Sequence, residues 1–263
     1  MPHRCQGASA SAIHQIHAIL HRAFAVAVKW RWMDRNPADL ATRPRPASDD
    51  RDPPTPRDAA RLLEAAEAYR PDLALWLWLL LVTGTRRGEL CAIRWTDIDF
   101  ARQDLLIERA YAIRGGRKLI KPTKTHQRRR LALDPATVEL LAEYRQLCGK
   151  RAEEAGGTVA ADGYVFSSDG FGEQPWPPDT VTHWFQRVRA AAGVDCTLRS
   201  LRHYNATQML AAGIDLRTAA GRLGHAGGGA MTLKVYAHRT RPADQRAAEL
   251  LAAELRARRS GVV

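Results

Sequence analysis

The sequence lacks the features that mark several large classes of protein. Its longest apolar run, residues 73–82, is too short to span a bilayer, and no N-terminal segment has the charged start, apolar centre and small-residue cleavage site of an export signal. The cysteines are few, lie far apart and form no C-x-x-C pair: Cys5, Cys91, Cys148 and Cys196. We therefore expect a cytoplasmic protein with reduced, mostly buried thiols, no metal site, no other cofactor and no membrane partner.

Acidic residues are also scarce relative to basic ones. The 263 residues include 40 lysines and arginines against 28 aspartates and glutamates, which gives a formal net charge of +12. Such a balance concerns the partner rather than the fold, and nucleic acid is the first candidate, ahead of an anionic membrane. A basic protein without a polyanionic partner is the third possibility. The hydrophobic share of 45% supports a sizeable core in one large domain or two smaller ones.

Two changes in composition divide the chain. Apolar residues recur at helical spacing over 11–32, Asn36-Pro37 stops that helix, and residues 43–56 carry several prolines among charges. The pattern predicts a partial helical domain over 1–42, a Pro-rich linker over 43–54, a second domain over 55–245 and a C-terminal helix and tail over 246–263.

The second domain is predicted to be mainly helical with a small three-stranded antiparallel sheet. One strand region covers 105–113, Gly115-Gly116 turns the chain, and further strands cover 118–120 and 130–133, with Lys124 in the turn between these last two. Gly84 and Gly193 each end a helix. Helices are expected from the Thr55 cap to about 69 and over 73–82, 87–93, 135–148, 179–192, 200–212, 215–223 and 242–258.

Five residues stand in an order suited to metal-free phosphoryl transfer to a tyrosine hydroxyl: Arg86, Lys124, Arg202, His225 and, eleven residues later, Tyr236. Phosphodiester cleavage by a tyrosine builds negative charge on the non-bridging oxygens, and planar guanidinium groups can stabilise that charge. A lysine can protonate the leaving oxygen, and a histidine can bind a phosphate oxygen or move a proton near neutral pH.

Each of these residues alone has an ordinary structural explanation. A surface arginine, a solvated turn lysine, a helix-capping histidine and a core tyrosine are all common. Lys121 also competes with Lys124 for the lysine position. Only the joint order of the five favours the catalytic interpretation.

Longer motifs surround these residues. They are TGTRRGEL at 83–90, RWTDID at 94–99, TKT at 123–125 followed by 128–133, LRHYNAT at 201–207, LGH at 223–225 and YAH at 236–238. Over roughly residues 55–245 the chain therefore resembles the tyrosine recombinase, or phage integrase, family.

The resemblance implies an α+β catalytic domain, preceded by a helical clamp domain that closes on double-stranded DNA. It implies site-specific cleavage and rejoining of DNA through a 3′-phosphotyrosine on Tyr236, in the integration or excision of a mobile element. Arg86 and Arg202 hold the phosphate, Lys124 is the general acid and His225 assists. Glu89 and Asp97 are expected to support Arg86 and the fold. Tetramer formation on DNA and accessory DNA-bending proteins are the expected associations.

Two features depart from the family pattern. The position three residues before Arg202 is usually histidine but is Arg199 here, and arginine binds a phosphate oxygen but is a poor general base. Residues 1–42 are expected to supply only the last one or two helices of the clamp. The alternative is therefore a truncated DNA-binding remnant that does not recombine. A basic helical regulator with a helix-turn-helix at 200–223 explains the charge but neither Tyr236 nor Lys124.

Overall fold

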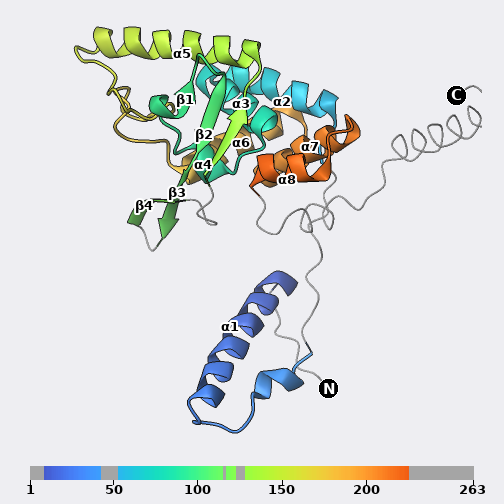
Figure 1. Cartoon of the computed structure of the whole chain (residues 1–263). Coiled ribbons are helices and arrows are strands. Elements are labelled where there is room, and N and C mark those ends of the chain that lie inside the picture. Colours follow the sequence, from blue (N-terminus) through green and yellow to red (C-terminus); the bar gives the residue numbers. More distant parts are fainter. Residues whose placement is uncertain (1–8, 43–52, 115–116, 123–127, 225–263) are drawn as a thin grey trace, which may run out of the picture. The chain divides into compact units, whose positions relative to one another are not determined.

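The computed structural model describes residues 9–42, 53–114, 117–122 and 128–224, and the chain divides into two compact units, Met1–Asp52 and Pro53–Val263 (Figure 1). The predicted helix 242–258 lies outside the described residues. Within the described part of the chain, no helix combines the length and apolarity needed to cross a membrane.

The first unit contains α1 (Ala10–Lys29) and the 3-10 helix η1 (Pro37–Leu40). The helix predicted over 11–32 is confirmed, but it ends at Lys29, and Arg31 adopts a left-handed φ of 59°. Asn36 joins the two elements, because its Oδ1 accepts from the Ala38 amide at 2.9 Å and its Nδ2 donates to the His21 carbonyl at 3.1 Å.

Several helices of the second unit begin or end at residues that local chemistry predicts. Thr55 Oγ1 accepts from the Asp58 amide at 3.1 Å, and the left-handed Gly84 (φ 61°) and Gly193 (φ 62°) end two helices. The fourth helix of the chain stops at Leu90 instead of 93, and the fifth continues past 148. In the described part of this unit the helices are α2 (Pro56–Tyr69), α3 (Pro71–Thr83), α4 (Arg87–Leu90), η2 (Trp95–Asp97), α5 (Pro135–Glu154), α6 (Pro178–Ala192), α7 (Leu198–Ala211) and α8 (Leu216–Leu223).

The small three-stranded antiparallel sheet is confirmed, but its strands differ from the predicted ones. It consists of β1 (Ile98–Asp99), β2 (Asp104–Ile107) and β5 (Arg129–Ala132), in the order β1-β2-β5. The predicted strand region 105–113 is two strands, because the chain leaves the sheet at Glu108. The strands β3 (Arg109–Arg114) and β4 (Arg117–Pro122) form a separate hairpin, which projects from this unit (Figure 1).

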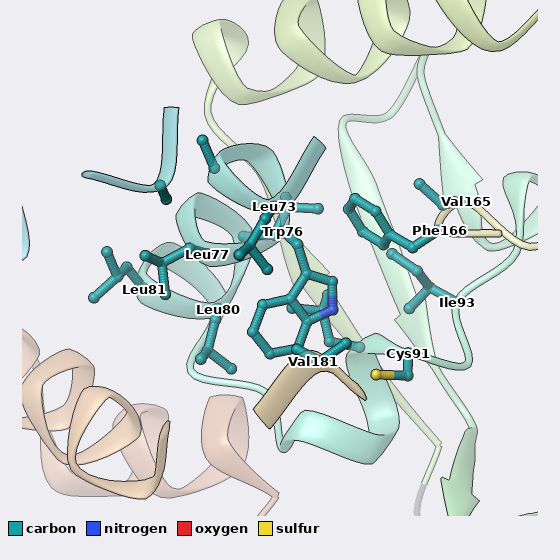
Figure 2. Packing of buried hydrophobic residues seen from close by; sticks show 14 of the residues in the cluster. Leu73, Trp76, Leu77, Leu80, Leu81, Cys91, Ile93, Val165, Phe166 and Val181 are labelled. Carbon is teal, nitrogen blue, oxygen red and sulfur yellow. The ribbon is translucent and has the colours of Figure 1, made fainter. Parts of the chain in front are cut away.

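The core of the second unit is built around α3. Its apolar residues surround the helix on all sides, so the helix is buried against α2 and α7. Trp76 is fully buried, and it lies in one cluster with Cys91, Phe166 from a loop and Val181 from α6 (Figure 2). The segment from Gly84 to Arg86 follows the last turn of α3. A helix packed in this way holds that segment rigidly in place.

Leu80→Ala should lower the free energy of unfolding by about 2–5 kcal/mol, because it removes a fully buried side chain from α3 and leaves a cavity. Leu140→Ala on α5, where the leucine is 40% exposed, is the matched control and should change it by about 0.5 kcal/mol or less. Urea denaturation followed by tryptophan fluorescence measures both. Equal effects of the two substitutions would contradict this account of the core.

Candidate active site

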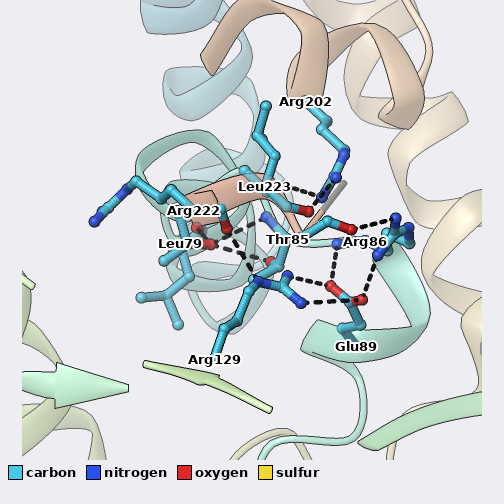
Figure 3. Close-up of polar contacts among 11 residues, drawn as sticks. Leu79, Thr85, Arg86, Glu89, Arg129, Arg202, Arg222 and Leu223 are labelled. Carbon is cyan, nitrogen blue, oxygen red and sulfur yellow. Dashed lines mark hydrogen bonds and ion pairs between the residues drawn. The ribbon is translucent and has the colours of Figure 1, made fainter. Parts of the chain in front are cut away.

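Arg86 lies between the end of α3 and the start of α4. Its amide donates to Glu89 Oε2 at 3.0 Å and its Nη1 donates to Glu89 Oε1 at 2.7 Å (Figure 3). Its Nη2 donates to the Gly224 carbonyl at 3.1 Å. The side chain is nevertheless 41% exposed, so the guanidinium group is held at two points and remains accessible to a ligand.

Arg202 lies on α7 and donates to two helix ends. Its Nη1 contacts the Gly84 carbonyl at 2.5 Å, and its Nη2 donates to the Leu223 carbonyl (Figure 3). The carbonyls at a helix C-terminus lack partners within the helix and carry partial negative charge, which favours a cation there. Because Leu223 and Gly224 are consecutive, the last turn of α8 brings the Arg202 and Arg86 guanidinium groups together.

Two glycines permit the close approach of these segments. Gly84 and Gly224 both have left-handed φ angles, 61° and 65°, and end α3 and α8. A Cβ atom on Gly84 would lie 2.5 Å from Asn205 Oδ1, and one on Gly224 would lie 2.8 Å from Arg129 Nη1. Any other residue would be strained at these φ angles, and its Cβ would displace the side chain of Asn205 at position 84 or of Arg129 at position 224.

Glu89 is a buried carboxylate shared by two arginines. Its side chain is 2% exposed, and besides Arg86 it contacts Arg129 from β5, with Nη2 to Oε2 at 2.6 Å (Figure 3). Burial alone would raise the pKa of Glu89, but the hydrogen bond and charge of Arg129, followed by the hydrogen bonds from Arg86, lower it below its ordinary value. The carboxylate is therefore ionised at neutral pH, and its predicted support of Arg86 is confirmed.

Asp97 supports a different part of the fold. It accepts from the Arg94 amide at 2.8 Å and from Arg109 Nη1 at 2.8 Å, so it joins η2 to the start of β3. Burial raises the pKa of Asp97, and hydrogen bonds and the Arg109 charge only partly offset that effect. The expectation that Asp97 supports the fold is confirmed, but the described contacts do not include Arg86.

Of the remaining predicted site residues, only Arg199 is among those that the structure describes. Arg199 is exposed on α7, one turn before Arg202, and the two side chains share a helix face. Burial, together with the charges of Arg199 and Arg202, lowers the pKa of the neighbouring His203, so its neutral form is favoured near pH 7. The other predicted site residues, Lys124, His225 and Tyr236, lie outside the described residues, so their roles stay predictions.

Two arginines at this site were missed by the sequence analysis. Arg129 contacts Glu89, and Arg222 Nη2 donates to the carbonyls of Val82 and Ala132, both at 3.1 Å. The strand pattern in the sequence was one indication of the position of Arg129. Arg129 lies two residues before the buried Leu131 on a strand, which places both side chains on the same face.

The arrangement is suited to binding an oxyanion. Two guanidinium groups are anchored on consecutive carbonyls, and the planar fork of a guanidinium group matches two oxygens of a phosphate. Among the residues that the structure describes, no group of three or more histidine, cysteine or acidic side chains could hold a metal ion.

Sequence comparisons identify similar proteins. The model of the Phage integrase family matches residues 55–242. A XerC-like tyrosine recombinase of Caldanaerobacter subterraneus subsp. tengcongensis is 26% identical, over 89% of this chain and 63% of its own length. The integrase of Enterobacteria phage 434 is 29% identical, over 72% of this chain and 46% of its own length. The chain thus spans less than two thirds of either relative.

Solved structures share the fold. A Tn1549 transposon integrase in complex with transposon right end DNA superposes with a TM-score of 0.77 at 21% identity, over 94% of this chain and 81% of that one. A lambda integrase tetramer bound to a Holliday junction gives a TM-score of 0.62 at 22% identity, over 86% and 59%. These likenesses confirm the predicted fold class.

Glu89→Gln should lower the free energy of unfolding by about 3–5 kcal/mol at pH 7, because it leaves the buried Arg129 without a counter-charge. The folded-state pKa of Glu89 lies below its ordinary value of 4.5, so its contribution is present above that value and is lost as the pH falls through the folded-state pKa. The difference between wild type and variant should therefore shrink in acid.

Urea denaturation at pH 7 and near pH 3 measures this difference. Glu139→Gln on the exposed face of α5 is the matched control and should change the free energy of unfolding little at either pH. A difference between wild type and Glu89→Gln that stays constant from pH 7 to pH 3 would show that the carboxylate is not held ionised by the two arginines.

Proposed function

Because the chain belongs to the phage integrase family, we propose that it is a tyrosine-type site-specific recombinase that cuts and rejoins double-stranded DNA. The observation that supports the proposal most directly is the pair of guanidinium groups of Arg86 and Arg202, anchored on the consecutive carbonyls of Gly224 and Leu223. The net charge of +12 fits a polyanionic substrate.

In the proposed reaction, the Tyr236 hydroxyl attacks the scissile phosphorus, a 3′-phosphotyrosine bond forms and the bond to the 5′ oxygen breaks. Arg86 and Arg202 bind the non-bridging oxygens, where negative charge grows in the transition state. Lys124 protonates the departing 5′ oxygen, and His225 holds a phosphate oxygen. A 5′ hydroxyl of the partner strand then reverses these steps. The phosphotyrosine bond conserves the energy of the phosphodiester, so the exchange requires no nucleotide.

Arg199 is assigned to phosphate binding rather than to proton transfer. It is exposed on the same face of α7 as Arg202, so its guanidinium group can add a further donor to the phosphate. A guanidinium group is not deprotonated in proteins, so arginine is a poor general base. The proton of Tyr236 must therefore go to another acceptor or to water.

The proposal extends to assembly and biological role. The similar lambda integrase is a tetramer on a Holliday junction, and the similar Tn1549 integrase is bound to transposon DNA. We assign this chain the same kind of assembly on DNA and a role in the integration or excision of a mobile element, with accessory DNA-bending proteins. The first unit, with α1, acts as part of the clamp on DNA.

Tyr236→Phe should abolish the covalent protein–DNA adduct while DNA binding persists, because only the nucleophilic hydroxyl is removed. The assay uses nicked duplexes that carry candidate attachment sequences from the DNA around the gene, followed by a denaturing gel. Tyr69→Phe removes the hydroxyl of a 41% exposed tyrosine on α2 and is the matched control, with adduct formation retained. If Tyr236→Phe formed the adduct at the wild-type level, the assignment of Tyr236 as the nucleophile would be wrong.

Arg86→Ala or Arg202→Ala should slow adduct formation by roughly a hundredfold or more, and should weaken DNA binding far less, because these groups act on charge that develops in the transition state. Arg102→Ala removes one positive charge from a side chain that is 76% exposed, and should leave the adduct rate nearly unchanged. Single-turnover rates and a binding titration separate the two effects. Equal losses of rate and affinity would mean that the arginines only anchor the phosphate.

A further inference from the structure

Arg129 contacts two separate elements of the site with one guanidinium group. Its Nη2 and Nη1 donate to the two oxygens of Glu89, at 2.6 and 3.4 Å, and its Nε donates to the Arg222 carbonyl at 3.0 Å (Figure 3). The side chain is only 9% exposed, so it does not take part in binding DNA from the surface. A buried arginine with its three kinds of nitrogen all engaged is held in one orientation.

These contacts complete a closed ring. Arg129 is joined to Glu89, Glu89 to Arg86, and Arg86 to the Gly224 carbonyl. Arg129 is itself joined to the Arg222 carbonyl, two residues before Gly224. The ring therefore begins and ends at the C-terminal end of α8, and its three side chains come from β5, from α4 and from the loop before α4.

We propose that Arg129 is a positioning residue for the cleavage reaction: it orients Glu89, and through Glu89 the guanidinium group of Arg86, relative to the end of α8. The inference rests on the proposed function. Arg86 alone has a flexible side chain, and a small displacement of a group that stabilises a transition state is costly to the rate. Arg129 supplies the orientation without touching the substrate.

The charge balance around Glu89 explains why Arg129 is needed. The charged groups that the structure places against the carboxylate are Arg86 and Arg129, whereas the Arg222 guanidinium group donates to the carbonyls of Val82 and Ala132. Without Arg129, burial raises the pKa of Glu89, and the carboxylate takes up a proton more readily. A neutral Glu89 binds Arg86 less strongly, because the hydrogen bond between them is then no longer assisted by two charges.

The test compares Arg129→Met with the matched control Arg130→Met. Arg130 is the next residue of β5, is exposed and points to the opposite face of the strand. Arg129→Met should slow adduct formation at pH 7 by about a hundredfold, with DNA affinity nearly unchanged. Arg130→Met should retain the wild-type rate of adduct formation. Arg129→Lys keeps the positive charge but loses the planar guanidinium group. This variant should therefore fold, and its rate of adduct formation should lie between those of wild type and Arg129→Met.

The pH profile separates positioning from a merely structural role. In Arg129→Met the raised pKa of Glu89 makes the adduct rate climb with pH over a range where the wild-type rate, with Glu89 already ionised, does not depend on that group. Glu89→Gln imitates the protonated carboxyl, so adding Arg129→Met to it should cost little further rate. A pH-independent loss that is fully additive with Glu89→Gln, or a loss equal to that of Arg130→Met, would overturn the proposal.

The experiment also distinguishes failure of the positioning role of Arg129 from failure of the proposed function. If wild type forms no adduct with any candidate DNA site, the proposed function fails, and the inference about catalysis fails with it. If wild type forms adduct and the Arg129 variants keep its rate and pH profile, only the positioning role fails. NMR titration of the Glu89 carboxyl carbon provides a readout independent of activity, and an unchanged pKa in Arg129→Met contradicts the charge argument in either case.

Discussion

The buried carboxylate of Glu89 is the constraint on which the candidate site depends. Removing a charge from water costs several kcal/mol, and the cost is offset only where counter-charges and hydrogen bonds surround it. Here Arg86 and Arg129 meet that requirement, and they come from a loop beside α4 and from β5. Since both arginines also donate to carbonyls at the end of α8, neutralising one carboxylate draws three distant segments of the chain together.

Helix ends supply the other half of the site. The helices α3 and α8 both terminate at left-handed glycines, and the carbonyls at or beside these glycines accept hydrogen bonds from Arg202 and Arg86. Because most of the side chains of α3 are buried, its C-terminal turn is a rigid platform for Gly84 and the arginine that follows. Packing in the core thus determines where the guanidinium groups lie, and those groups determine what the site can bind.

Local chemistry made much of this predictable from the sequence. The Thr55 cap and the glycines that end α3 and α6 follow from short-range rules, and the motifs around Arg86 and Arg202 pointed to residues that the structure brings together. The break between β2 and β3 was not predictable, since apolar runs at 105–107 and 110–113 flank Glu108 and Arg109 and together resemble one long strand. The role of Arg129 was hidden for another reason: Glu89 lies forty residues earlier, and local patterns do not reveal such a contact.

The most direct test of the account concerns the charge that Arg86 and Arg202 are proposed to stabilise. A methylphosphonate at the scissile position replaces one charged non-bridging oxygen with a neutral methyl group. If the arginines act on developing negative charge, the factor by which Arg202→Ala slows adduct formation should fall from roughly a hundredfold on phosphate to less than about tenfold on methylphosphonate. The same factor on both substrates would contradict the account, because the arginine would then contribute equally whether or not the charge is present.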